Sequence, residues 1–158
     1  MGLNEHHYGL SVEWTGNRGT GTSGYRDYGR DHTINAPGLP ELLGSADPTF
    51  HGDKTRWNPE LLLLGALSEC HMLSYLHVAV LHNVRVISYS DDAVGTMILN
   101  ADGSGQFESV TLRPRVGLAD PAQESLAQEL HREASQKCFI ARSVNFPVHH
   151  EPLVLPAS

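Results

Sequence analysis

The sequence predicts an α+β fold in which antiparallel sheets accompany two helices, arranged as one domain over residues 1–158. Three observations support this class. The longest apolar segment, from Asn58 to Asn83, is long enough for a central helix; several short segments alternate apolar and polar residues, as strands do; and residues 120–137 have the spacing of a second, amphipathic helix. We find no internal repeat and no linker, so a single domain is expected.

The chain before the central helix predicts short strands separated by loops. Residues 8–14 alternate as in a half-buried strand, and residues 25–34 are expected to form the next one. The glycine-rich stretch between them, Thr15–Gly24, has no helix pattern after it, so we interpret it as a hairpin turn or loop and not as a dinucleotide site. Arg18 is the residue of interest in this loop. The LPELL segment, residues 39–43, is either a strand or a turn of helix.

The central helix carries clear signals at both ends. Asn58 can cap its N-terminus, Pro59 suits the first helical position, and Glu60 suits the positive end of the helix dipole. Asn83 can close the other end. About 24 helical residues would extend roughly 36 Å at about 1.5 Å per residue. Apolar residues occur on every side, so we expect a helix that is buried nearly all round.

A membrane-spanning role fits this helix poorly, because four polar or ionisable residues interrupt it. These residues are Glu69, His71, His77 and His82.

Downstream of the central helix, the sequence predicts a meander of antiparallel strands, a helix and a last strand. The helix should begin at Asp120-Pro121, with Gln123 as capping-box partner of Asp120. The tail from His149 onward, which follows the last predicted strand and is interrupted by prolines, is expected to be loose. The predicted strands cover residues 84–89, 94–99, 107–116 and 139–148.

Composition limits the possible partners. The net charge of −7 argues against nucleic acid or an anionic membrane. No signal peptide is visible, so the cytoplasm is the expected compartment. The two cysteines, Cys70 and Cys138, would stay reduced there, and any disulfide between them should be transient. Their separation in sequence rules out a CxxC motif.

From these residues alone, Cys70 is either a packed small hydrophobe or a protected reactive thiol. A mid-helix position gives it no help from a helix N-terminus, so activation would need a neighbouring side chain, with arginine the natural candidate. Helical spacing places Ala66, Leu67, Leu73, Ser74 and His77 on its face. His77 is about 10 Å along the axis and too far to act as a direct base.

The ten histidines give only a weak metal signal. The pairs His6-His7 and His149-His150 lie near the termini and are expected to be solvated. His71, His77 and His82 do not form an HExxH motif. No metal and no cofactor is therefore expected, although a protein with a His/Cys metal site stays a third hypothesis.

Three segments together resemble the OsmC/Ohr family of thiol-dependent peroxidases: WTGNRGTGT at Trp14–Thr22, NPELLLLGALSEC at Asn58–Cys70, and KCF at Lys137–Phe139. The resemblance implies an OsmC-like fold, an intertwined homodimer, a hydroperoxide substrate and a dithiol reductant of the lipoyl type or a small thiol.

The resemblance also implies the site residues. Cys70 matches the peroxidatic cysteine and Cys138 the resolving one, while Glu60 matches the family glutamate. The family arginine matches Arg18 best, with Arg56 as a rival.

One geometric argument supports a shared site. Glu60 and Cys70 lie ten residues apart on one helix, about 15 Å along its axis, so they cannot touch within one chain. If both serve one site, a partner subunit must supply one of them.

Two departures from the family pattern concern the neighbours of the cysteines. Phe139 stands where proline is frequent in the family, and Glu69 and His71 flank Cys70, although both should point away from the thiol.

From the resemblance we predict a two-cysteine peroxidase acting in oxidative stress defence. The alternative is a non-enzymatic ligand-binding or stress-associated dimer of the same fold with inert thiols.

Overall fold

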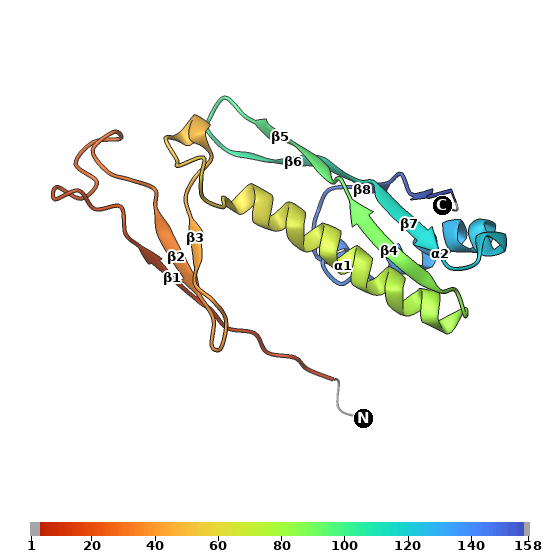
Figure 1. The fold of residues 1–158 in the computed structure, drawn as a ribbon. Coiled ribbons are helices and arrows are strands. Elements are labelled where there is room, and N and C mark those ends of the chain that lie inside the picture. The colour runs from red at the N-terminus through yellow and green to blue at the C-terminus, as the bar shows by residue number, and fades with distance from the viewer. Residues whose placement is uncertain (1–3, 157–158) are drawn as a thin grey trace. The chain divides into compact units, whose positions relative to one another are not determined.

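The central helix α1 (Pro59–Leu81) dominates the computed structural model, which describes residues 4–156 (Figure 1). The chain forms two compact units, one ending at Leu62 and the other beginning at Leu63. The structure combines two α-helices with antiparallel and mixed sheets, which confirms the predicted α+β class. The assignment of residues 1–158 to one domain stays a prediction.

Both predicted ends of α1 are confirmed. The Oδ1 atom of Asn58 accepts a hydrogen bond from the N–H of Leu61 at 2.9 Å, satisfying one of the free donors of the first turn. At the other end Asn83 adopts the left-handed conformation, with φ 56°, and the N–H of Val84 returns to the carbonyl of Ala79 at 2.9 Å. These bonds fix the length of the helix.

The prediction that α1 is buried nearly all round is wrong for the single chain. Its buried residues, Leu67, His71, Tyr75, Val78 and Ala79, form one stripe. The other face is uncovered, and Leu73 and Val80 are 61% and 71% exposed. α1 is long and apolar enough to cross a membrane. The core helix of a soluble protein can meet the same criteria of length and composition.

The first unit contains one antiparallel sheet in the order β1 (Ser11–Trp14), β2 (His32–Asn35), β3 (Leu42–Gly44). The LPELL segment thus contributes a strand. The half-buried strand predicted at residues 8–14 is instead exposed along all of β1. A short 3-10 helix, η1 (Pro48–Phe50), precedes α1.

The strand predicted at residues 25–34 is shorter than expected. Residues 25–28 form turns, because the guanidinium of Arg30 donates to the carbonyls of Tyr25 and Tyr28, both at 2.6 Å, and lies over both rings. Only the last residues of the segment remain free to pair in β2.

The second unit contains two three-stranded sheets, in the orders β4-β7-β9 and β5-β6-β8. The predicted meander is only partly correct, because β5 and β6 form a hairpin but β4 pairs with β7. The strand predicted at residues 107–116 is divided at Arg113 between β6 and β7. The strand bounds are β4 (Val86–Asp91), β5 (Val94–Leu99), β6 (Gly105–Leu112) and β7 (Pro114–Leu118).

The second predicted helix is α2 (Glu124–Lys137), preceded by the 3-10 turn η2 (Pro121–Gln123). Asp120 caps this start, since its Oδ1 accepts from the N–H of Ala122 at 3.0 Å. The predicted capping box between Asp120 and Gln123 is wrong. The side chain of Gln123 donates to the carbonyl of Asn83 at 3.0 Å and so ties the start of α2 to the end of α1.

The predictions for the C-terminal segment are largely wrong. The expected strand at residues 139–148 is mostly a turn and the 3-10 helix η3 (Ala141–Ser143), held by Arg142 N–H donating to the carbonyl of Cys138 and by Ser143 Oγ donating to that of Phe139. The tail is not loose: β8 (Val148–His150) and β9 (Leu153–Val154) pair in parallel with β6 and β7.

Two hydrophobic clusters hold α1 to the rest of the second unit. Tyr75, Val78 and Ala79 of α1 pack with residues of β7 and with Ala127, Leu130 and Ala134 of α2. Leu67 packs with Val110 and Leu112 of β6. This packing orients α1 so that Cys70, between the two clusters, faces the end of α2.

Candidate functional site

The two cysteines, far apart in sequence, lie together in the fold. Cys70 lies near the middle of α1, and Cys138 is the first residue after α2. Both are free thiols, with Cys70 half-buried and Cys138 buried. The difference in exposure makes Cys70 the sulfur that a solute can reach.

The thiol of Cys138 lies next to that of Cys70. Burial, followed by the neighbouring Cys70 thiol, raises the pKa of Cys138 to about 11. The N–H of Ala141 in η3 donates to the sulfur of Cys138 at 3.4 Å. Cys138 is therefore held as a neutral thiol against Cys70.

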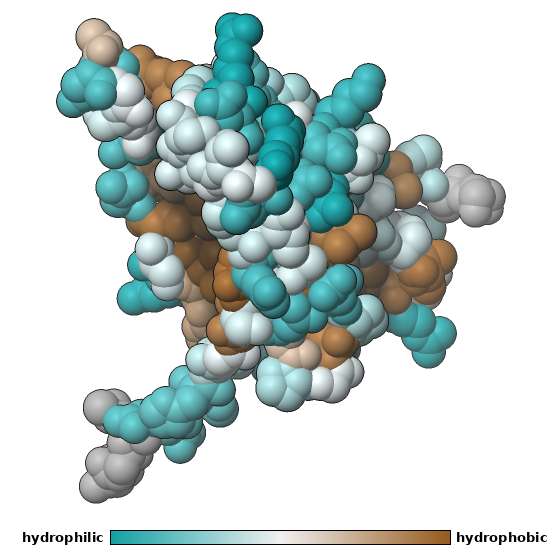
Figure 2. Space-filling view, turned by 90° about the vertical axis from the view of Figure 1, so that its left-hand side faces the viewer, coloured by the Kyte–Doolittle hydropathy of each residue, from teal (hydrophilic) through white to brown (hydrophobic). Residues whose placement is uncertain are grey.

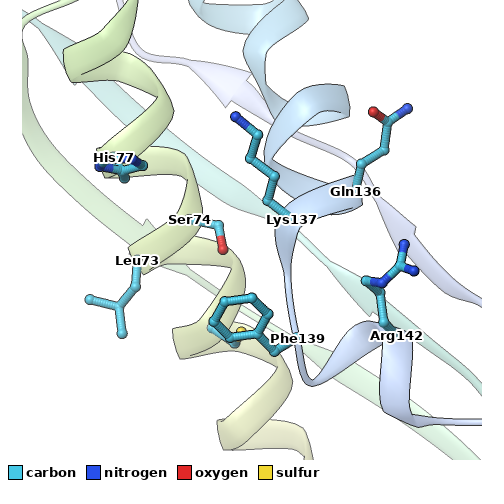
Figure 3. A pocket seen from close by; sticks show the side chains of 8 residues that line it. Leu73, Ser74, His77, Gln136, Lys137, Phe139 and Arg142 are labelled. Carbon is cyan, nitrogen blue, oxygen red and sulfur yellow. The ribbon is translucent and has the colours of Figure 1, made fainter. Parts of the chain in front are cut away.

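A pocket of about 530 Å³ opens beside Cys70 in the second unit (Figure 3). Leu73, Ser74 and His77 of α1 line it, as the helical spacing around Cys70 predicted, whereas Leu67, expected on the same face, is buried in the core and Ala66 does not line the pocket. The opposite wall comes from the end of α2 and the segment after it: Gln136, Lys137, Phe139 and Arg142.

Sequence reasoning missed the residues of this opposite wall. It placed residues 139–148 in a strand, whose side chains would alternate, whereas the turn and η3 bring Phe139 and Arg142 to one side. Lys137 also forms an ion pair with Glu133, Nζ to Oε1, at 2.8 Å. The basic KCF segment was the available signal, but only the cysteine in it was used.

The glycine-rich loop presents Arg18 in the first unit. The side chain of Asn17 accepts hydrogen bonds from the N–H groups of Gly19 and Gly21, at 2.9 and 3.0 Å, and both glycines have positive φ. Arg18 donates to the carbonyl of Arg26 at 3.3 Å. No carboxylate of residues 4–156 pairs with it within 4 Å.

The rival arginine is engaged elsewhere. Arg56 Nε lies 3.5 Å from an oxygen of Asp31 and 4.0 Å from one of Asp53, and its guanidinium donates to the carbonyl of His32 at 3.4 Å. These contacts anchor Arg56 to the sheet of the first unit, so of the two candidate arginines Arg18 is the one without a paired carboxylate among residues 4–156.

Glu60 has a buried oxygen, Oε2, with no hydrogen-bond partner among the residues that the structure describes. It forms no ion pair with Arg18 in its own chain, as far as residues 4–156 are concerned. A buried carboxylate oxygen without a hydrogen-bond donor costs free energy.

A buried group of aromatic rings lies behind Cys70. His71 Nε2 and His131 Nδ1 are 3.0 Å apart, and the ring of His131 stacks on Tyr75 with centroids 3.9 Å apart. The ring of His150 is 4.4 Å from that of His71, so the prediction that His150 is solvated is wrong. The parallel pairing of β8 with β6 carries His150 inward.

The environment of these histidines keeps them neutral. Burial, followed by the nearby His150 and His131, lowers the pKa of His71 to about 3; burial and His150 lower that of His131 to about 4. Burial raises the pKa of Tyr75 to about 12. Across the part of the chain that the structure describes, no three His, Cys, Asp or Glu side chains are grouped so as to hold a metal ion.

Comparison with known proteins decides the family. A sequence model described as OsmC-like protein matches residues 51–152, which is most of the chain. The chain belongs to the OsmC-like family. In this OsmC-like protein the matched region contains α1, both cysteines and the whole pocket.

Similar proteins agree with this assignment. A solved OsmC-like protein of unknown function from Vibrio cholerae O1 biovar eltor is 31% identical, with a TM-score of 0.83, covering 94% of this chain and 100% of that one. The uncharacterised protein YmaD of Bacillus subtilis (strain 168) is 25% identical over 89% of this chain and 87% of its own length.

A second solved structure shares the fold at lower identity. It is an organic hydroperoxide resistance protein OsmC, also described as a predicted redox protein, from Legionella pneumophila. The TM-score is 0.70 at 15% identity, covering 94% of this chain and 96% of that one.

Proposed function

We propose that this OsmC-like protein is a two-cysteine peroxidase that reduces organic hydroperoxides, or hydrogen peroxide, in oxidative stress defence. The observation that carries the proposal is the contact between the half-buried thiol of Cys70, which lines a pocket, and the buried thiol of Cys138. Family membership, with organic hydroperoxide resistance proteins among the similar structures, supports the same chemistry.

The reaction uses the two thiols in sequence. The Cys70 thiolate attacks the terminal oxygen of ROOH; the O–O bond breaks, the thiolate becomes a sulfenic acid, and the alkoxide leaves as ROH after taking a proton. The thiol of Cys138 then attacks the Cys70 sulfur, forming a disulfide and releasing water. A dithiol of the lipoyl type, or small thiols, returns both cysteines to thiols and is itself oxidised to a disulfide.

Each cysteine has the environment that its role requires. Cys70 borders the pocket, where a hydroperoxide can reach it. Cys138 is 1% exposed and its raised pKa keeps it protonated, so it does not compete for the peroxide but is already next to the sulfenic acid when that forms. A peroxidatic thiolate also needs a positive neighbour, and we assign this role to Arg18, oriented by Glu60 through an ion pair.

A second copy of the chain completes the site in this proposal. Cys70 and Glu60 are about 15 Å apart along α1, so one chain cannot bring both to one peroxide. Among residues 4–156 Arg18 has no carboxylate partner and Glu60 has an unpartnered buried oxygen, and we assign the two side chains to one ion pair in the homodimer.

The uncovered apolar surface supports the same homodimer. Among residues 4–62 no hydrophobic side chain is buried, and Leu10 and Val12 are 65% and 60% exposed. Hydrophobic side chains reach the surface of the chain in Figure 2. A unit of this size needs apolar cover to be stable, and a partner chain laid on the exposed face of α1 and on β1 supplies it. We place the dimer in the cytoplasm, without a metal, a cofactor, nucleic acid or a membrane.

Peroxide consumption by the reduced protein tests the function. With cumene hydroperoxide and a dihydrolipoyl reductant, we expect turnover by the wild type and none by Cys70→Ser. Cys138→Ser should consume about one equivalent and then stop or over-oxidise at Cys70. Equal consumption by Cys70→Ser and the wild type would refute the mechanism, and thiols that stay unreacted in the wild type would favour the inert dimer.

A further inference from the structure

The pocket beside Cys70 has an uneven distribution of charge. The protein carries a net charge of −7, yet none of the eight residues lining this pocket is acidic. Two of them, Lys137 and Arg142, carry permanent positive charge. A basic pocket next to the reactive thiol of an acidic protein indicates selection for negative charge in what binds there.

The two basic residues are not equivalent. Lys137 is already neutralised by Glu133, with Nζ and Oε1 2.8 Å apart. Arg142 has no carboxylate of residues 4–156 within 4 Å, and its side chain makes no hydrogen bond in that part of the chain. Its guanidinium is therefore free to bind an anion, and its planar fork matches the two oxygens of a carboxylate.

The rest of the lining fits an alkyl chain. Leu73 and the ring of Phe139 form apolar walls, and Phe139 stands between α1 and Arg142 (Figure 3). A volume of about 530 Å³ is in the range of sites for small organic ligands. A ligand with an apolar chain and a carboxylate at one end would place the chain along Leu73 and Phe139 and the carboxylate at Arg142.

We propose that Arg142 is a specificity residue that binds the carboxylate of an acidic alkyl hydroperoxide, so that this protein prefers anionic over neutral hydroperoxides. The inference rests on the proposed peroxidase function and names the substrate class of the same site. Arg142 binds the end of the substrate remote from the O–O bond and takes no part in the cysteine chemistry. Added salt should weaken the preference, because it screens the charge pair.

The test measures the oxidative half-reaction alone, so that the charge of the reductant plays no part. Pre-reduced protein is mixed with ω-hydroperoxyoctanoate or its methyl ester, and the loss of thiols is followed by rapid quenching with an alkylating agent. The variants are Arg142→Gln and, as matched control, Arg132→Gln, which removes the same charge from an exposed position of α2 outside the pocket.

The expected result is a rate with the carboxylate that falls roughly tenfold or more in Arg142→Gln, as is usual for a lost charge-assisted hydrogen bond, and less than about twofold with the ester. Arg132→Gln should change neither. Equal rates of the wild type with both hydroperoxides, or an equal loss with both in Arg142→Gln, would overturn the specificity proposal while leaving the peroxidase function intact.

A binding measurement separates the two proposals if no hydroperoxide is reduced. Calorimetric titration of Cys70→Ser with octanoate and with octanol needs no chemistry at the thiol. Tighter binding of octanoate, lost when Arg142→Gln is added, would support the anion site even if the peroxidase function failed. Equal or absent binding of the two ligands would overturn it. Circular dichroism checks that each variant is folded.

Discussion

The buried histidines behind Cys70 should make the protein sensitive to mild acid. In the unfolded chain a histidine takes up a proton near its ordinary pKa of about 6.5. In the folded protein the pKa is about 3 for His71 and about 4 for His131. The unfolded state therefore binds more protons over this window, so stability is complete above about pH 6.5 and falls as the pH drops toward the folded values.

The size of the effect follows from the two shifts. At pH 5 each histidine lies about 1.5 units below its unfolded pKa, which corresponds to about 2 kcal/mol per site, or about 4 kcal/mol for both. Tyr75 on α1 and His150 on β8 contact the pair, while on β4 Tyr89 packs on Tyr75 and Asp91 acts on His150. Asp91 alone is acidic, and it is occupied by Ser68 and the N–H of Arg113.

Urea unfolding followed by circular dichroism at pH 7.5 and pH 5 measures this dependence. The wild type should lose about 4 kcal/mol between the two, and His71→Gln about 2 kcal/mol less, whatever its stability at pH 7.5. His149→Gln, at the exposed neighbour of His150, is the matched control and should behave as the wild type. Equal stability of the wild type at both pH values, or a full pH dependence in His71→Gln, would rule out this role of the buried histidines.

Three further predictions concern stability and assembly. Asn58→Ala removes the cap of α1 and should lower the free energy of unfolding by about 1 kcal/mol, measured in urea; no change would mean that the cap is dispensable. Tyr75→Phe removes the 2.9 Å hydrogen bond to the carbonyl of Ala127 and should also destabilise by about 1 kcal/mol, whereas equal stability would contradict a role for this bond. Val80→Asp puts a charge on the exposed face of α1 and should yield monomers in sedimentation experiments. The control Leu99→Asp, in the β5–β6 hairpin, should leave the dimer intact. A dimer that survives Val80→Asp would place the interface elsewhere.

Local signals in the sequence predicted the parts of the fold that local physics determines. The cap at Asn58, the left-handed Asn83 and the helix between them need only neighbouring residues, and the side chains sharing a face with Cys70 follow from helical spacing. Cys138 was likewise expected at or just beyond the end of a helix.

What the sequence did not predict depends on contacts between distant segments. His150 becomes half-buried only because β8 pairs with β6, and Arg142 enters the pocket only because the turn after Cys138 replaces a strand. Residues 139–148 were predicted to form a last strand, but the hydrogen bond from Ser143 to the carbonyl of Phe139 closes a turn there. The exposed face of α1 was not predicted either, because apolar residues on every side of the helix do not show which side the rest of the chain packs against.

The central claim is that Cys70 and Cys138 act as one redox pair. One equivalent of organic hydroperoxide is added to the reduced protein, and the intact mass and free thiols are measured within seconds under denaturing, non-reducing conditions. We expect the loss of two hydrogens and of both thiols through a disulfide within one chain, reversed by a dithiol. Two thiols that persist, or oxygen atoms added slowly to separate cysteines, would contradict it.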